Sequence, residues 1–272
     1  MADQQTKGEV FRALHETGCF IIPNPWDVGS AKLMTNMGFK ALASTSSAFA
    51  RSTGVNDYEL TREQVIAHIG DLCGSTHLPV SADLENGFGH APEDCAETIK
   101  LGAAAGLVGG SIEDFTGTPG ELYEIAHAQD RIAAAVEAAQ NLPHPFILTA
   151  RAENHFTGDG DLADSIKRLQ AYQEAGADVL YAPGLRSLAD IQSVIASVDR
   201  PINVLRGPKE GLVPITQLAT LGVRRISLGG SLGMLAMDAV YKAGTELLEH
   251  GTFNYTEGST PAEKIIKLMI DE

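Results

Sequence analysis

Short apolar runs alternate along the chain with longer segments in which apolar residues recur at helical spacing. The runs are rich in β-branched and aromatic residues, and they end at Gly, Pro, Ser or carboxylate residues. Such alternation is typical of βα units that build a parallel sheet. We predict eight strands, near residues 20–23, 41–45, 79–85, 107–114, 146–153, 178–183, 201–206 and 224–229.

The intervening segments carry helix signals. Helical patterns cover residues 27–38, 61–76, 92–106 and 162–177, with Pro92 in a first turn and Gly176 as a stop. Dividing the 272 residues among eight units leaves about 34 per unit, which suits a closed (β/α)8 barrel better than a doubly wound sheet. We therefore expect an α/β fold of the TIM-barrel type that forms one domain over residues 1–272.

The last stretch, residues 253–272, follows the eighth unit and forms a separate extension. A turn at residues 257–259 precedes a helical pattern whose apolar positions share one face: Ile265, Ile266, Leu268, Met269 and Ile270. We expect this terminal helix to pack on its own barrel or on a neighbouring subunit.

Composition narrows the functional classes. Twenty basic and 35 acidic residues give a net charge of −15, which argues against nucleic acid or an anionic membrane surface as a partner. Cys19, Cys73 and Cys95 form no CxxC pair, so neither a disulfide framework nor a thiolate zinc site is indicated. No basic-apolar leader and no apolar run of about 20 residues is present. These features predict a cytoplasmic protein.

Carboxylates follow two neighbouring strands at the end where barrel enzymes place their active sites. Asp83 and Glu85 lie two apart after the third strand, on one face, and Glu113 with Asp114 closes the fourth. Converging acids would repel one another, and a hard cation such as Mg²⁺ would relieve this repulsion. The alternative is that some of these acids cap helices or pair with basic side chains.

The remaining strand ends offer groups for an anionic substrate. Arg151 sits among apolar residues and must face a carboxylate, of substrate or of protein, such as Glu113 or Glu153. Small hydroxyl residues in S-T-S-S-A-F could hold a carboxylate or an oxyanion, and Asn203 could bind a polar substrate group.

Two other observations leave alternatives open. The segment R-R-I-S-L-G-G-S-L-G after the eighth strand has the composition of a phosphate-binding loop around residues 229–231, which would suit a metal-independent enzyme acting on a phosphate ester. His90 and His155 fall on strand-end loops and are secondary candidates.

Several motifs, in order over residues 8–245, resemble the isocitrate lyase and phosphoenolpyruvate mutase superfamily. They include F-I-I-P-N-P-W-D, S-T-S-S, R-S-T-G-V-N-D, D-x-E-N-G-F-G, S-I-E-D, T-A-R-A-E and S-L-G-G-S-L. The resemblance implies a (β/α)8 barrel that binds Mg²⁺ and a 2-oxo acid or its enolate.

The resemblance also implies roles for particular residues. Asp83 and Glu85, in D-x-E where the family usually has D-x-D, and Glu113 correspond to the metal-binding acids. Arg151, Glu113 and Asp57 correspond to the catalytic set, Arg151 holding the substrate carboxylate and Asp57 contacting the metal through water. The substrate-binding groups correspond to Thr45, Ser46, Ser47, Arg151 and Asn203.

One departure bears on the activity. The carbon–carbon lyases that cleave isocitrate and methylisocitrate carry a K-[KR]-C-G-H loop after the fourth strand, and this chain has F-T-G-T-P-G-E-L-Y-E-I-A-H there. We therefore expect a Mg²⁺-dependent lyase that cleaves a C–C bond in another small 2-oxo or 2-hydroxy acid or dicarboxylate. Phosphonopyruvate mutase or hydrolase chemistry, oxaloacetate decarboxylation and a non-catalytic metabolite-binding barrel are the alternatives. The resemblance also implies a homotetramer or dimer, with the terminal helix exchanged between subunits.

Overall fold

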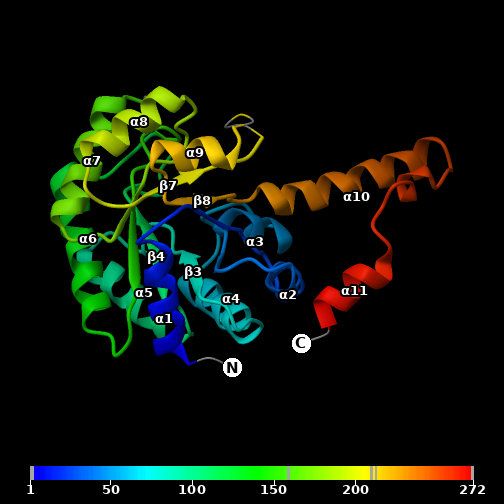
Figure 1. Cartoon of the computed structure of the whole chain (residues 1–272), viewed down its shortest axis with the longest axis horizontal. Coiled ribbons are helices and arrows are strands. Elements are labelled where there is room, and N and C mark those ends of the chain that lie inside the picture. Colours follow the sequence, from blue (N-terminus) through cyan, green and yellow to red (C-terminus); the bar gives the residue numbers. More distant parts are fainter. Residues whose placement is uncertain (1–2, 158–159, 209–210, 212, 271–272) are drawn as a thin grey trace.

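The computed structural model describes residues 3–157, 160–208, 211 and 213–270, and its centre is a sheet of eight strands (Figure 1). The predicted strands are all present, and most are shorter than the apolar runs. Their bounds are β1 Phe20–Ile22, β2 Leu42–Ala43, β3 Val80–Asp83, β4 Gly109–Glu113, β5 Ile147–Arg151, β6 Val179–Tyr181, β7 Ile202–Leu205 and β8 Arg225–Ser227.

All neighbouring strands are parallel, and the sheet closes on itself. The order runs β1-β8-β7-β6-β5-β4-β3-β2. Across the remaining gap, the amide of Ala43 donates to the carbonyl of Pro23 at 3.0 Å. The predicted TIM-type barrel of eight parallel strands is therefore confirmed.

The helices that link the strands begin where the sequence signals placed them. Asp27 and Thr61 accept from the third helical amide of α2 and α4, Pro92 opens α5, and Gly176 follows α7 with a φ of 100°. The bounds are α2 Val28–Asn36, α4 Arg62–Gly74, α5 Pro92–Ala104, α6 Ile125–Gln140, α7 Leu162–Glu174, α8 Leu188–Ser197 and α9 Ile215–Leu221.

Two further helices lie at opposite ends of the barrel. Before β1, α1 (Gln4–Leu14) buries Phe11 against Ile147 and Val179, near the starts of β5 and β6, so it covers the N-terminal end. After β2, α3 (Ser46–Ser52) begins where the sequence suggested only a loop. Its N-cap is Thr45, whose hydroxyl accepts from the amide of Ala48 at 3.4 Å.

The C-terminal extension forms an arm. α10 (Ser231–Glu249) projects away from the barrel, and α11 (Ala262–Ile270) turns back towards α2 after the 3-10 turn Asn254–Thr256 (Figure 1). Asn36 of α2 donates from Nδ2 to the carbonyl of Leu268 at 2.8 Å, so α11 packs on its own chain. Exchange of this helix between subunits and the single-domain assignment stay predictions, and residues 271–272 of the predicted helix lie outside the described part. No helix within the described ranges has the length and apolar character needed to cross a membrane.

Candidate active site

Most of the predicted site residues line a cavity of 1120 Å³ at the C-terminal ends of the strands, whereas Glu85 and Glu113 lie behind its wall. Asp83 and Arg151, the last residues of β3 and β5, both line this cavity. A smaller cavity of 440 Å³ lies between α1 and α6 at the opposite end of the barrel. The larger cavity is therefore the one to which the candidate chemistry belongs.

Arg151 is the centre of a cluster of ion pairs. The β4–β5 register sets Glu113 directly beside Arg151, and Nη1 of Arg151 lies 3.1 Å from Glu113 Oε2. The same nitrogen lies 3.3 Å from Asp83 Oδ1, and Nε donates to Glu153. Both protein pairings expected for Arg151, with Glu113 and with Glu153, are present. Contact of Arg151 with a substrate carboxylate stays a prediction.

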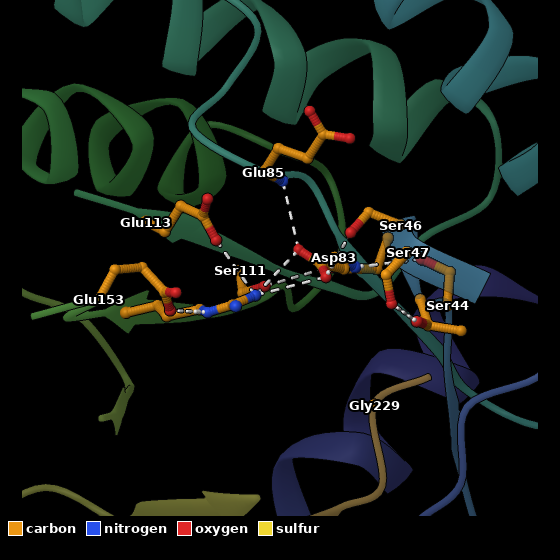
Figure 2. Close-up of polar contacts among 12 residues, drawn as sticks. Ser44, Ser46, Ser47, Asp83, Glu85, Ser111, Glu113, Glu153 and Gly229 are labelled. Carbon is orange, nitrogen blue, oxygen red and sulfur yellow. Dashed lines mark hydrogen bonds and ion pairs between the residues drawn. The ribbon is translucent and has the colours of Figure 1, made fainter. Parts of the chain in front are cut away.

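Asp83 is held from three sides. Its Oδ2 accepts from the hydroxyl of Ser46 at 3.1 Å, and its Oδ1 accepts from the amide of Glu85 at 3.3 Å. Its own amide donates to Ser44 Oγ at 3.1 Å. Figure 2 shows this carboxylate between the serines that follow β2 and the acids Glu85 and Glu113. These contacts fix its direction before any ligand binds.

Glu85 occupies a different position from the one that an extended strand would give it. Its φ is 49°, so β3 has already ended, and Figure 2 shows the Glu85 carboxylate turned away from Asp83. The side chain is buried, and burial together with the charges of Asp83 and Asp57 raises its pKa to about 8. Asp83 and Glu113 thus face one another across Arg151, whereas Glu85 points elsewhere.

These acids do not form a ready-made cage for a metal. In the described part of the chain, no three His, Cys, Asp or Glu side chains are close enough to hold an ion by themselves. Assignment of Asp83, Glu85 and Glu113 as metal ligands stays a prediction. A bound ion would take most of its ligands from water or substrate.

Asp57 and Tyr58 reach the site from the loop that follows α3. Burial and the charge of Asp83 raise the pKa of Asp57, against the opposing effects of Ser46, Arg151 and Arg51. The hydroxyl of Tyr58 donates to Glu113 Oε1, and its ring meets Phe115 edge to face. Tyr58 has a φ of 65°, which is uncommon for a bulky residue, and sequence reasoning did not identify it.

The proposed carboxylate-binding groups border the same cavity. Thr45, Ser46 and Ser47 lie at the start of α3, where Thr45 Oγ1 is 3.3 Å from Ser47 Oγ. Asn203 of β7 is buried at the cavity wall and donates from Nδ2 to Ser227 Oγ at 2.9 Å. The structure therefore brings the expected substrate-binding residues to one place, although no contact with substrate is tested.

The loop after β8 is engaged by the protein itself. The amides of Leu228 and Gly229 both donate to Asn24 Oδ1, at 2.8 and 2.9 Å. A phosphate-binding loop needs such amides to point at the ligand. These contacts weigh against the phosphate-ester alternative.

The secondary candidates lie outside the cavity wall. His90 pairs through Nδ1 with the hydroxyl of Tyr123 at 2.6 Å, and His155 adjoins Gly184. All three cysteines are free thiols, as expected. The segment that stands where the resembling lyases carry their cysteine loop forms a short turn bridged between Phe115 and Leu122.

Comparison with known proteins identifies the family. The phosphoenolpyruvate phosphomutase family matches residues 11–248 of the chain. A Burkholderia cenocepacia J2315 protein, provisionally described as a lyase/mutase, has a crystal structure with a TM-score of 0.94 and 50% identity, covering 97% of this chain and 95% of that one.

Two other relatives have named activities. An oxaloacetate decarboxylase of Rhodopseudomonas palustris is 28% identical over 250 residues, which cover 89% of this chain and 84% of that protein. The structure of 2,3-dimethylmalate lyase has a TM-score of 0.85 at 25% identity, covering 99% of this chain and 95% of that one.

The fold is a (β/α)8 barrel with acids and an arginine at the C-terminal ends of its strands. The match over residues 11–248 makes the assignment specific: the chain belongs to the phosphoenolpyruvate mutase/isocitrate lyase superfamily.

Proposed function

We propose that this protein is a Mg²⁺-dependent lyase that cleaves a C–C bond in a small 2-oxo or 2-hydroxy acid and releases a 2-oxo acid of the pyruvate type. The reaction would pass through an enolate, whose negative charge develops on an oxygen beside the carboxylate. The residues at the C-terminal ends of the strands must therefore include preorganised groups that stabilise this negative charge.

The observation that carries this proposal is an excess of buried negative charge around one guanidinium. Arg151 interacts electrostatically with each of the acids Asp57, Asp83, Glu85, Glu113 and Glu153. One cation cannot neutralise all of them, and burial raises the pKa of Glu85 to about 8 and of Glu153 to about 7. Buried charge of one sign normally has a partner, and here a second cation would provide it.

The donor set fits magnesium. Asp57 Oδ1 and Glu85 Oε1 are buried and have no hydrogen-bond partner among the described residues. Hard oxygen ligands suit Mg²⁺, which keeps several waters and therefore needs few protein ligands. Asp83 would hold the ion, Asp57 and Glu113 would act directly or through water, and Glu85, whose carboxylate is turned away from Asp83, would act through water alone. When bound, Mg²⁺ would supply positive charge at the developing enolate oxygen.

The protein's own groups would orient the substrate. Thr45, Ser46 and Ser47 present hydroxyls at one side of the cavity, where a carboxylate fits. The guanidinium of Arg151 and the hydroxyl of Ser46 both contact Asp83, so Arg151 is close enough to hold a second oxygen of the same acid. This placement is proposed from the positions of the side chains.

Relatives support the reaction class and leave the substrate open. By their names, one relative removes a carboxyl group from oxaloacetate and the other is a lyase acting on 2,3-dimethylmalate, so both act on small acids. Phosphonopyruvate chemistry is the second candidate, because the family match carries the mutase name.

A substrate panel tests the proposal. The protein would be incubated with Mg²⁺ and oxaloacetate, phosphonopyruvate or a series of substituted malates, and products followed by ¹³C and ³¹P NMR. We expect a 2-oxo acid from at least one carbon substrate and none from the Arg151→Met variant. Turnover confined to phosphonopyruvate would favour the second candidate.

We also propose that the protein assembles as a dimer or tetramer. The α10 arm exposes apolar side chains far from the barrel core, including Val240, Tyr241 and Leu248, which are 68, 73 and 90% exposed. A second copy would cover this face. Light scattering of the parent protein and of a Val240→Asp/Leu248→Asp variant should show the larger mass only for the parent.

A further inference from the structure

Arg225 lies inside the barrel with no acidic partner. It is the first residue of β8, it is 5% exposed, and it lines the cavity from below. Among the described residues no Asp or Glu pairs with it, whereas Arg151 and Arg168 each have carboxylate partners. Burial lowers the pKa of Arg225 to about 10. A buried guanidinium without a carboxylate partner lowers the stability of the fold, which indicates that Arg225 has a role other than stabilisation.

The contacts of Arg225 indicate where it acts. Its Nε donates to Asn203 Oδ1 at 2.9 Å, and Nη2 donates to Thr149 Oγ1 at 2.9 Å. Nη1 lies 3.4 Å from Nε2 of His15, whose Nδ1 is 2.8 Å from the carbonyl of Phe11. Because a guanidinium only donates, Nε2 of His15 is the acceptor. Burial and the charge of Arg225 lower the pKa of His15 to about 3, so this ring is neutral.

The contact with Asn203 removes an ambiguity from that side chain. An amide can present either its oxygen or its NH₂ group, and neighbouring hydrogen bonds decide which. Nε of Arg225 requires the oxygen, so Nδ2 is turned to the other side and donates to Ser227 Oγ. The second N–H of Nδ2 has no partner among the residues described, and Asn203 lines the cavity.

We propose that Arg225 is a positioning residue: it fixes the Asn203 amide so that an N–H donor faces the cavity. The β7 side of the site then accepts a ligand oxygen, such as that of a carboxylate or an oxo group, and rejects a donor. This inference rests on the proposed function only for the kind of ligand, a small oxo acid anion.

Oxalate, a stable dianion that resembles a pyruvate enolate, is the probe. Its affinity would be measured by titration calorimetry in Mg²⁺ buffer for the parent, Arg225→Met, Asn203→Ala and the double variant. Loss of one hydrogen bond to a charged ligand should weaken binding about tenfold in each single variant. If Arg225 acts through Asn203, the double variant should bind no more weakly than Asn203→Ala alone.

Thr149→Val is the matched control. It removes another hydrogen bond of Arg225 and leaves the Asn203 contact in place, so oxalate affinity should stay within about twofold of the parent. Parental affinity in Arg225→Met would overturn the proposal. Losses that multiply to about a hundredfold in the double variant would do the same, and so would absence of oxalate binding to the parent.

Asn203→Asp covers the case in which Arg225→Met does not fold. The new carboxylate would pair with Arg225 and present no N–H to the cavity, so we expect a higher melting temperature and at least tenfold weaker oxalate binding. Parental oxalate affinity in this variant would contradict the proposal. Turnover is measured separately. If the oxalate affinities of the Arg225 and Asn203 variants behave as expected but the parent turns over no substrate, the proposed lyase function is wrong and the role of Arg225 still holds.

Discussion

Nη1 of Arg151 lies 3.3 Å from both carboxylate oxygens of Asp83, joining the end of β5 to the end of β3 across the mouth of the barrel. The same nitrogen reaches Glu113, so one guanidinium stands between acids from neighbouring strands. Asp83 is thereby held facing the cavity, where a ligand can reach it.

Asp83→Asn should remove most of the activity and leave the fold intact. The amide keeps the shape of the side chain and its place beside Ser46, and it loses the charge that would hold Mg²⁺. We expect kcat/KM to fall by about two to three orders of magnitude. Asp71→Asn, at an exposed position of α4, is the control and should retain parental rates. Full activity of Asp83→Asn would argue against a role for this acid.

Glu85→Gln should make the metal-free protein more stable and less responsive to Mg²⁺. Glu85 is buried near Asp83 and Asp57, so without a cation the folded protein must protonate this carboxyl, whose pKa is about 8, and glutamine avoids that cost. Saturating Mg²⁺, at about 100 times its Kd, should stabilise the parent by about 2.7 kcal/mol, and the variant by clearly less. Thermal melts with and without Mg²⁺ measure both effects. Glu97→Gln, on the exposed side of α5, should melt like the parent under both conditions.

Tyr58→Phe should destabilise the protein. Its hydroxyl is the donor to Glu113 Oε1, and the variant leaves that oxygen buried and unpaired. We expect the free energy of unfolding to fall by about 1–3 kcal/mol in urea titrations. Tyr255→Phe, at an exposed position of the arm, should change nothing. An unchanged Tyr58→Phe variant would mean that Glu113 finds another donor.

Stability should fall on acidification because of buried histidines. His68 stacks on Phe49 with ring centroids 3.6 Å apart, and burial lowers its pKa to about 4 even though Asp71 and Asp27 act to raise it. In the unfolded chain the pKa of His68 is near 6.5, so the unfolded chain binds a proton before the folded protein does as the pH drops from about 6.5 towards 4. Protonation of this ring favours unfolding throughout that window.

His68→Phe keeps the stacked ring and removes the titrating group. The parent's loss of stability between pH 7 and pH 5 should shrink by about 2 kcal/mol in this variant, measured by urea titration at both pH values. An identical loss in parent and variant would show that folding does not lower the pKa of His68.

The fold was predictable because the apolar runs that form the strands end at Gly, Pro, Ser or carboxylate residues and alternate with helical patterns. The weakest expectations concerned α3: Ser, Thr and small residues serve equally in a loop and at a helix start, so composition did not identify the helix that begins at Ser46. The strands are shorter than the apolar runs because apolar residues beyond the strand ends are buried by packing without joining the hydrogen-bonded ladder.

The site was predictable where strand ends carry it, and less so elsewhere. Asp83, Glu113 and Arg151 terminate strands and contact one another, while their roles stay predictions. Glu85 turns away because its own backbone is left-handed, with a φ of 49°, and the sequence D-L-E-N-G does not predict that conformation for a glutamate. Tyr58 depends on the path of a loop. Arg225 had a usable signal, a charged residue two positions before Ser227 in an apolar strand, because alternate residues of a barrel strand point inward.

The central claim is that the excess of acids around Arg151 binds the Mg²⁺ on which C–C cleavage depends. The most direct test is the initial rate of 2-oxo acid release from the best panel substrate, measured after exhaustive chelation and again after Mg²⁺ is restored. The account predicts that chelation abolishes the rate and that Mg²⁺ restores it in the parent but not in Asp83→Asn. Parental rates that survive complete removal of divalent metal would contradict it.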